Sequence, residues 1–222
     1  MTRPRRGRPA SGSELSLAVV VAGARDLVRE LGVDGLTMRK LALRLGVDVS
    51  SLYWHVSGKD ALVDLVADDL LGEAEWPDPA LPWRERVEGA LVEYRRLLLA
   101  NRDAARILAG RWVQGPNTLR ALETLLSALL SAGLDRRAAA EAAFLLNGYV
   151  TGFVLQELLP MNAAEALGAT PADTLARVNE QLKSLPEEEF PSVRLVADEL
   201  TAPGMDDRFR RGIALTLTGL GA

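Results

Sequence analysis

A mixed, mostly polar set of side chains between positions 49 and 59 has the types and spacing to contact nucleic acid. Val49, Ser50 and Tyr53 share one side of a predicted short helix, and His55 lies towards its end. Hydroxyl and imidazole groups can hydrogen-bond to phosphate oxygens and to base edges. Lys59 follows at the start of the next predicted helix, where its charge and the free backbone N–H groups suit a phosphate. These residues predict a surface that contacts DNA.

Two short helices joined by a tight turn would position these side chains. Thr37 can cap the first helix, and Gly46 can end it in the left-handed conformation that glycine adopts at little cost. Asp48 can cap the second helix, over Val49–Val56, in which Leu52 and the last residue share a face that packs on the first helix. This is the design of a helix-turn-helix, whose second helix enters the DNA major groove. An ordinary helical hairpin is the alternative interpretation.

The composition gives little support to catalysis or metal binding. The 222 residues include no cysteine, and the one histidine is His55, which excludes disulfides, thiolate ligands and a His-Asp partnership elsewhere. No glycine-rich phosphate loop is present, and the consecutive carboxylates of Glu187, Glu188 and Glu189 are expected to form a solvated loop. We therefore predict that the chain is not an enzyme and requires neither a metal nor a cofactor.

The distribution of apolar residues predicts a cytoplasmic protein without a membrane partner. No uncharged apolar run reaches about 18 residues, as a membrane span would. The arginines near the N-terminus are not followed by the apolar segment of a signal peptide.

Charge is divided unevenly along the chain. Residues 1–59 hold ten Lys and Arg against five Asp and Glu, whereas residues 60–222 hold 16 against 25. This division suits a DNA-binding head on a body that avoids DNA. Residues 1–13, rich in proline and glycine, are predicted to be a disordered basic arm. The arm either solubilises the chain or enters an A·T-rich minor groove through Arg3, Arg5, Arg6 and Arg8.

Helical periodicity without strand-like alternation predicts an all-α fold. A helix from Glu14 to Leu31 would support the motif helices, and a fourth, from Asp60 to Gly72, has capping-box spacing with Ser57. The prolines of Glu75–Pro82 then break the chain. The remaining predicted helices span Trp83–Leu99, Arg102–Ala109, Asn117–Ala132 with Asn117 as cap, Arg136–Leu159 with Asp135 as cap, Ala163–Leu185 with breaks at Gly168 and Pro171, and Met205–Leu220.

The motif residues resemble a known family. The runs LTMRKLALRLGV, from Leu36 to Val47, and SLYWHVSGKDAL, from Ser51 to Leu62, closely resemble the DNA-binding domain of the tetracycline-repressor (TetR) family. The LYWHV run points to the branch nearest the tetracycline repressor. The resemblance implies a three-helix DNA-binding domain followed by a larger helical domain that binds an effector and dimerises. It implies DNA contacts at Thr37, Met38, Arg39, Val49, Ser50, Ser51, Tyr53, His55 and Lys59.

The chain departs from the tetracycline repressor at both kinds of site. Val49 and Ser50 stand where that repressor has glutamine and proline, so the operator should differ, because valine can contact a thymine methyl but cannot pair with adenine. Glu75 and Leu108 stand at the positions of the drug-binding and magnesium-binding histidines, and Ala90 replaces an asparagine contact. We therefore expect a different effector that needs no metal. Its candidate contacts are Tyr94, Leu108, Arg111, Trp112 and Asn147.

The resemblance also implies a dimer. The helix predicted from Arg136 to Leu159 is apolar nearly all round, Gly148 and Gly152 would permit close approach of another helix, and the last helix has a similar character. These two helices suggest a four-helix interface between subunits, with simple core packing as the alternative.

The sequence thus predicts a homodimeric repressor that a small molecule releases from a double-stranded operator by shifting the helix Asp60–Gly72. A small-molecule binding or sequestering module with little specific DNA binding is the alternative. The expected domains are the arm at 1–13, the helix-turn-helix domain at 14–59, a connecting helix and proline-rich linker at 60–82, and an effector-binding and dimerisation domain at 83–222.

Overall fold

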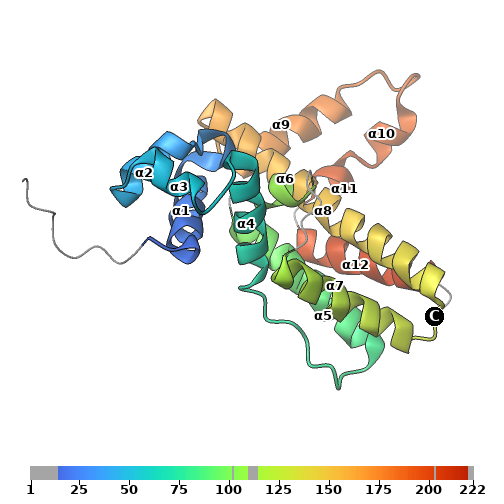
Figure 1. The fold of residues 1–222 in the computed structure, drawn as a ribbon. Coiled ribbons are helices and arrows are strands. Elements are labelled where there is room, and N and C mark those ends of the chain that lie inside the picture. Colours follow the sequence, from blue (N-terminus) through green and yellow to red (C-terminus); the bar gives the residue numbers. More distant parts are fainter. Residues whose placement is uncertain (1–14, 102, 110–114, 203, 220–222) are drawn as a thin grey trace, which may run out of the picture.

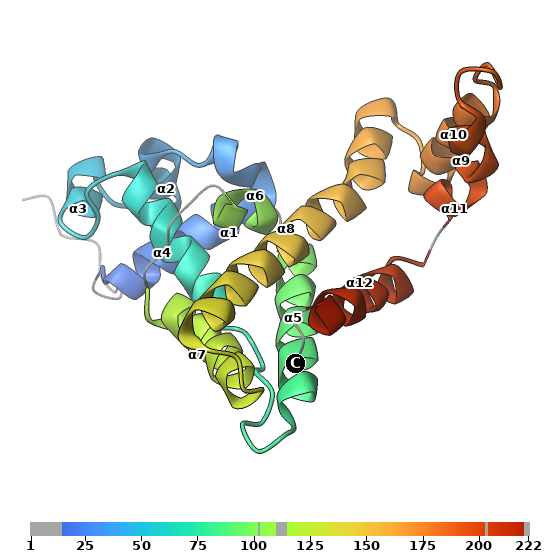
Figure 2. The same ribbon diagram turned by 90° about the vertical axis from the view of Figure 1, so that its right-hand side faces the viewer.

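The computed structural model describes residues 15–101, 103–109, 115–202 and 204–219. Within these ranges the regular elements are α-helices, and no strand occurs. The predicted all-α fold is therefore confirmed. The helices form a small N-terminal head and a larger body, and α2 and α3 lie at the end of the molecule farthest from the body (Figures 1 and 2).

The head consists of α1 (Leu17–Gly35), α2 (Met38–Leu45) and α3 (Val49–Tyr53), with α4 (Lys59–Leu71) leading out of it. Its core is formed by side chains that are at most 4% exposed, which include Val20, Leu27, Leu41, Leu52 and Leu62. The first helix begins later than predicted, because Ser16 is its N-cap and accepts from the N–H of Val19 at 3.3 Å. Gly32, the residue after the predicted end at Leu31, has non-helical angles, with a φ of 74° and a ψ of 168°.

The turn between α2 and α3 has the predicted form. The hydroxyl of Thr37 accepts from the N–H of Lys40 at 3.2 Å, and Gly46 has a left-handed φ of 67°. Asp48 precedes α3 but makes no side-chain cap, and the helix ends at Tyr53 rather than at Val56. The N–H groups of His55 and Val56 both reach the carbonyl of Leu52, at 2.9 and 3.0 Å. This last turn buries Leu52 and Val56 together, as their spacing predicted.

The body begins after a segment without helix at 74–82, where the prolines were expected to break the chain. Helices α5 (Trp83–Ala100), α7 (Pro116–Ser131) and α8 (Arg136–Leu167) pack on one another, with α6 (Ala104–Ala109) against α8 and α4. The last helix, α12 (Met205–Gly219), lies along α8. Between them α9 (Pro171–Lys183), α10 (Pro191–Leu195) and α11 (Ala197–Thr201) form a lobe that projects from the rest (Figure 2).

Three further predicted helix starts or ends, at α4, α7 and α8, were wrong. Gly58, rather than Ser57, is the N-cap of α4, and it makes no side-chain cap. Helix α7 starts at Pro116 after Gly115, because proline suits the first helical position, and Asn117 lies inside the first turn. Helix α8 continues through Pro160 to Leu167. Proline removes only one backbone hydrogen bond, a loss that a helix of 32 residues can tolerate. Asp135 caps α8 as predicted, accepting from Ala138 at 2.8 Å.

Side chains join the head to the body. The carboxylate of Asp103 accepts from the N–H of Val33 at 2.7 Å, and Arg106 of α6 pairs with Asp34 at 3.2 Å. Arg25 of α1 pairs with Asp69 of α4 at 3.0 Å and with Glu73, just after α4, at 2.5 Å. These ion pairs hold α1 against the end of α4. The position of the head therefore depends on α4 and α6.

The long helix α8 is buried on one side only. Ala142, Leu146 and Val150 are at most 1% exposed, whereas Leu145 on the opposite side is 56% exposed and Leu215 of α12 is 70% exposed. The helix has the length and hydropathy (1.4) of a membrane span, but its buried side packs on α5, α7 and α12. The single chain leaves its other apolar side uncovered.

Candidate nucleic-acid interface and effector cavity

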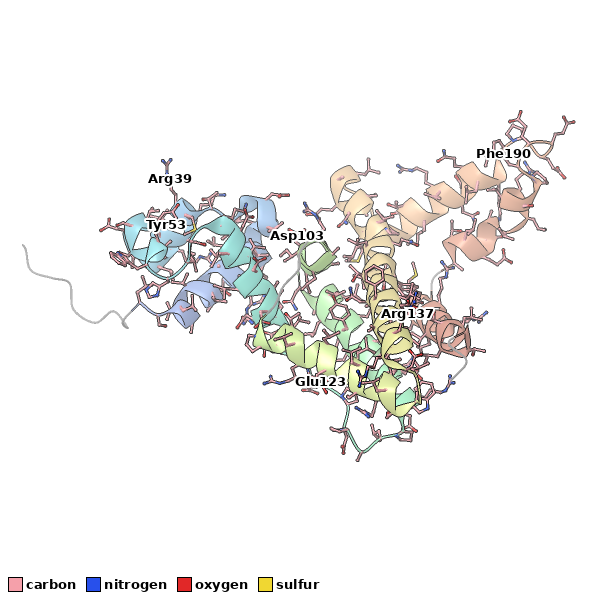
Figure 3. The ribbon with its side chains drawn as sticks, turned by 45° about the vertical axis from the view of Figure 1, so that its right-hand side comes forward. Arg39, Tyr53, Asp103, Glu123, Arg137 and Phe190 are labelled. Atoms are coloured by element: carbon pink, nitrogen blue, oxygen red, sulfur yellow. The ribbon has the colours of Figure 1, made fainter. Side chains whose placement is uncertain are left out.

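The predicted DNA contacts gather on α2, α3 and the turn that follows. Arg39 is exposed in the first turn of α2, and its side chain extends away from the head. Tyr53 lies at the same end of the head (Figure 3). Thr37 and Ser50 are exposed, whereas Met38, Val49 and Ser51 are partly buried. Among the residues that the structure describes, Arg39 has no ion-pair partner. Its guanidinium is therefore available to a base edge or a phosphate.

The sequence interpretation missed the most exposed aromatic residue of this region. Trp54 follows α3 directly and is 89% exposed, more than Tyr53 at 53%. The run LYWHV held the signal, since Leu52 and Val56 face the core and the residues between them must point elsewhere. An exposed indole has an N–H that donates and a flat apolar body, which suits a contact with the DNA backbone.

His55 and Lys59 lie closer to the body than the other predicted contacts. His55 is partly buried and borders a groove with Asp64 and Asp68 of α4 and Gly115 before α7. Lys59 is partly buried at the start of α4. The arm residues Arg3, Arg5, Arg6 and Arg8 lie outside the described residues.

The body contains a cavity of about 440 Å³. It is bounded by α4, α5, α6, α7 and α8, and Trp76 of the proline-rich segment also lines it. The described residues that line it are Leu71, Trp76, Ala90, Leu91, Tyr94, Leu108, Thr118, Ala121, Leu122, Leu125, Leu126, Ala140, Ala143, Phe144 and Asn147. None of these carries a charge. Four alanines leave the space open, and three aromatic rings border it.

The polar groups in the cavity are few. Among the described lining residues they are the hydroxyls of Tyr94 and Thr118, the amide of Asn147 and the indole N–H of Trp76. Burial raises the pKa of the Tyr94 phenol, although a hydrogen bond with Thr151 opposes the shift, so the hydroxyl stays protonated and able to donate at neutral pH. An apolar cavity with a few polar groups is typical of a small-molecule site.

The structure brings together three of the five predicted effector contacts. Tyr94, Leu108 and Asn147 line the cavity, whereas Arg111 and Trp112 lie outside the described residues. Phe144 was missed, although it lies one helical turn before Asn147 on α8 and the spacing could have identified it. Trp76 could not have been found this way, because it lies in a segment without periodicity.

Of the three positions that match metal and drug contacts of the tetracycline repressor, two line the cavity and one, Glu75, is not among the described lining residues. Leu108 and Ala90 both line the cavity, where neither side chain can bind a cation or donate a hydrogen bond. Glu75 is not among the described lining residues, and its N–H donates to Glu93 at 2.9 Å. The described lining therefore supplies no set of metal ligands.

Comparison with known proteins agrees with this arrangement. Residues 20–66 match the model of bacterial regulatory proteins of the tetR family, and residues 76–222 match the tetracycline repressor-like C-terminal domain. The chain is 34% identical to the class A tetracycline repressor of transposon 1721 from Escherichia coli, over 94% of this chain and 91% of the repressor. It is also 34% identical to an HTH-type transcriptional regulator from Saccharopolyspora erythraea, over 91% of this chain and 83% of that protein.

A solved structure shares the whole fold. ActR of Streptomyces coelicolor, in complex with actinorhodin, superposes with a TM-score of 0.82 at 34% identity, covering 94% of this chain and 97% of ActR. The DNA-binding head and the larger helical body therefore both have counterparts in ActR. Regulators of this family are dimers and are not enzymes. The chain therefore belongs to the TetR family of ligand-responsive transcriptional repressors.

Proposed function

We propose that this repressor is released from its operator when a bulky, largely apolar aromatic molecule occupies the cavity of the body. One observation carries the proposal. The cavity is bordered by Leu71, the last residue of α4, and α4 begins in the DNA-binding head. A ligand in the cavity thus touches the helix that sets the position of the head.

The proposed DNA contacts are exposed and partly exposed residues on and around α2 and α3, with the arm arginines in the adjacent minor groove. Arg39 and Val49 would read base edges, because the first can bind guanine bidentately and the second can contact a thymine methyl. Thr37, Met38, Ser50, Ser51, Tyr53, His55, Lys59 and Trp54 would complete the surface. The exposure of Thr37, Ser50, Tyr53 and Trp54 around α2 and α3 supports this assignment.

The chemistry of the lining supports the proposed effector class. Three aromatic rings can stack on a flat ligand, and the polar groups of Tyr94, Thr118 and Asn147 can orient it. ActR binds actinorhodin within a similar fold, which supports a small-molecule effector for this chain as well. Arg111 and Trp112 stay predicted contacts.

The uncovered sides of α8 and α12 are the proposed dimer interface. Apolar residues there are exposed in the single chain, and an ideal Cβ at Gly148 or Gly152 would meet nothing within 4 Å. A second copy can therefore approach closely. We also propose the domain boundaries predicted above and a location in the cytoplasm, where a DNA-binding regulator acts.

A sequestering module with a vestigial head is the less favoured function. Such a module would not need an exposed guanidinium at Arg39 or an exposed indole at Trp54 on the outer surface of its head. Both are present.

The test is fluorescence anisotropy with labelled duplexes. DNA from the region upstream of the protein's own gene and duplexes selected from a random pool are titrated at near-physiological salt, against scrambled DNA, because nonspecific affinity depends on salt. We expect selective binding of two protomers per site. Equal, weak binding to all duplexes would favour the sequestering module.

The bound complex then provides a release assay. Apolar aromatic compounds are screened for loss of anisotropy with and without a chelator. We expect release in both conditions. Release at micromolar concentration by magnesium–tetracycline alone would contradict the proposed metal-free effector.

A further inference from the structure

Asp68 of α4 forms a buried junction with the first turn of α7. Asp68 is 8% exposed. Oδ1 accepts from the N–H and the hydroxyl of Thr118, at 2.8 and 2.9 Å, and Oδ2 accepts from the N–H and the side-chain amide of Asn117, at 3.4 and 3.2 Å. The amide of Asn117 also donates to the backbone carbonyl of Asp68, at 3.1 Å. One carboxylate thus caps a helix of a different part of the molecule.

The carboxyl group of Asp68 lies unusually close to the backbone just before α7. An ideal Cβ on Gly115, the residue before α7, would lie 2.1 Å from Cγ of Asp68. A side chain at Gly115 would have to displace the carboxyl group of Asp68. The free N–H groups at the start of α7 and the partial positive charge of the helix end both favour the carboxylate. A carboxylate buried with four donors is held in one position, so movement of either helix breaks several hydrogen bonds together.

The same junction touches the cavity on one side and the head on the other. Thr118, which bonds to Asp68, also lines the cavity, and four further residues of α7 line it at helical spacing. On the other side, Asp69 follows Asp68 and pairs with Arg25 of α1 at 3.0 Å. Leu62, Val63 and Val66 of α4 are buried against the core of the head. The chain of contacts from cavity to head is therefore continuous.

We infer that Asp68 is the positioning residue that couples occupancy of the cavity to the orientation of the DNA-binding head. A ligand that displaces the start of α7, or competes for the hydroxyl of Thr118, changes the hydrogen bonds of Asp68 and releases α4. This inference rests on the proposed effector response. Its content is that the response passes through these hydrogen bonds and not only through general packing.

The test measures thermodynamic coupling between DNA and the cavity. Nile red, a neutral aromatic dye, is the cavity probe, and its dissociation constant is measured with the free protein and with the protein saturated by the selected operator duplex. Coupling is reciprocal, so a ligand that weakens DNA binding must itself bind more weakly when DNA is present. In the native protein we expect the ratio of the two constants to be at least about fivefold, at the lower end of typical allosteric coupling.

Two variants remove the junction. Asp68→Asn removes the charge, and Thr118→Val removes one hydroxyl while keeping the shape of the side chain. We expect the ratio to fall below twofold in both, and Thr118→Ser, which restores the hydroxyl, to recover it. Because each ratio is taken within one variant, any direct effect of Thr118 on dye affinity cancels. If Asp68→Asn does not fold, the Thr118 pair decides.

Matched controls separate the junction from its surroundings. Glu123→Gln removes one negative charge, as Asp68→Asn does, but on the exposed side of α7. Thr124→Val removes a hydroxyl that donates to the carbonyl of Arg120 in its own helix, at 2.9 Å, and to no other group among the described residues. Both should keep the native ratio. A native ratio that persists in Asp68→Asn and Thr118→Val would overturn the inference while leaving the effector response intact. A ratio of one in the native protein would overturn both.

Discussion

At the scale of single residues, the side chains of the recognition surface are not the ones that pack in the core of the head. Leu52 and Val56 are buried, and the residues between them are exposed or partly exposed. The surface can therefore change with the operator while the packing of the head stays the same. Val49 in place of a glutamine is such a change, because it replaces an adenine contact with an apolar one.

Replacing Arg39 with alanine should weaken operator binding by about 1–3 kcal/mol and relax the preference at one base pair, as loss of a bidentate guanine contact would. Binding to a set of duplexes with single substitutions measures both effects. Arg29→Ala, an exposed change on α1, is the control and should leave the base preferences intact. Weaker binding with unchanged base preferences would make Arg39 a phosphate contact.

Replacing Trp54 with alanine should separate stability from binding. Because the side chain is 89% exposed, the free energy of unfolding should change by no more than about 0.5 kcal/mol. Operator affinity should fall by about 1–2 kcal/mol if the indole N–H donates to a phosphate. Urea denaturation and anisotropy on the same preparation test this. Native operator affinity in the variant would show that Trp54 does not contact DNA.

At the scale of elements, the turn between α2 and α3 depends on a backbone conformation rather than on space. Gly46 has a φ of 67°, yet an ideal Cβ there would meet nothing within 4 Å. Any cost of a side chain at this position is therefore conformational.

Gly46→Ala should destabilise the protein by about 1–2 kcal/mol, the cost of the left-handed conformation for a residue with a Cβ. Gly58 is the matched control, because it also has open space around its Cβ but an extended φ of 162°. Denaturant titration should show little change for Gly58→Ala. Equal losses in the two variants would mean that the left-handed turn is not the cause.

The body is joined by an ion cluster between three helices. The guanidinium of Arg95 on α5 bonds to Glu157 of α8 at 2.6 and 2.8 Å and to Asp206 of α12 at 2.6 Å. It also lies 4.9 Å from the ring centre of Phe209. The side-chain hydrogen bond with Glu157 is the largest cause that raises the pKa of Arg95, so the group stays charged.

Arg95→Met should destabilise the protein by about 3–5 kcal/mol, because it leaves the largely buried carboxylate of Glu157 without a partner. A second change, Glu157→Gln, should recover part of the loss. Thermal and urea unfolding of the single and double variants measure the difference. A double variant that is no more stable than Arg95→Met would show that packing on Phe209, rather than charge, is lost.

At the scale of the whole molecule, the uncovered sides of α8 and α12 connect assembly to DNA binding. Two heads must lie about 34 Å apart to occupy successive major grooves, so a head on its own can read only half of a palindromic site. The interface and the cavity share α8, since Ala140, Ala143 and Asn147 line the cavity from that helix.

Changing Leu145 and Leu215 together to arginine should convert the dimer to a monomer, because both exposed apolar side chains would become charged at the proposed interface. Light scattering after size exclusion measures the mass, and a palindromic operator should then bind no better than a half-site. Leu119→Arg, at a residue of α7 that is 54% exposed, is the control. A variant that stays dimeric would place the interface elsewhere.

Sequence alone determined the features whose cause lies within one or two helical turns. The caps Thr37 and Asp135, the left-handed Gly46 and the break at the prolines are all of this kind, because neighbouring residues along the chain satisfy or remove the backbone hydrogen bonds involved. The same local signals indicated the helix-turn-helix. The predicted cap of α7 failed, because Pro116 takes the first helical position. The side chain of Asn117, inside that turn, instead bonds to Asp68 across 49 residues, which no local signal could indicate.

Only the tertiary structure decided the cavity, the junction at Asp68 and the cluster of Arg95, whose partner Asp206 is 111 residues away. Tyr94, Leu108 and Asn147 were candidates by resemblance, but Trp76, Phe144 and the alanines joined them only through the packing of five helices. Helical periodicity tells which side of a helix is apolar. It does not tell which other helix covers that side or where the covering is incomplete, because that depends on how distant parts of the chain pack together.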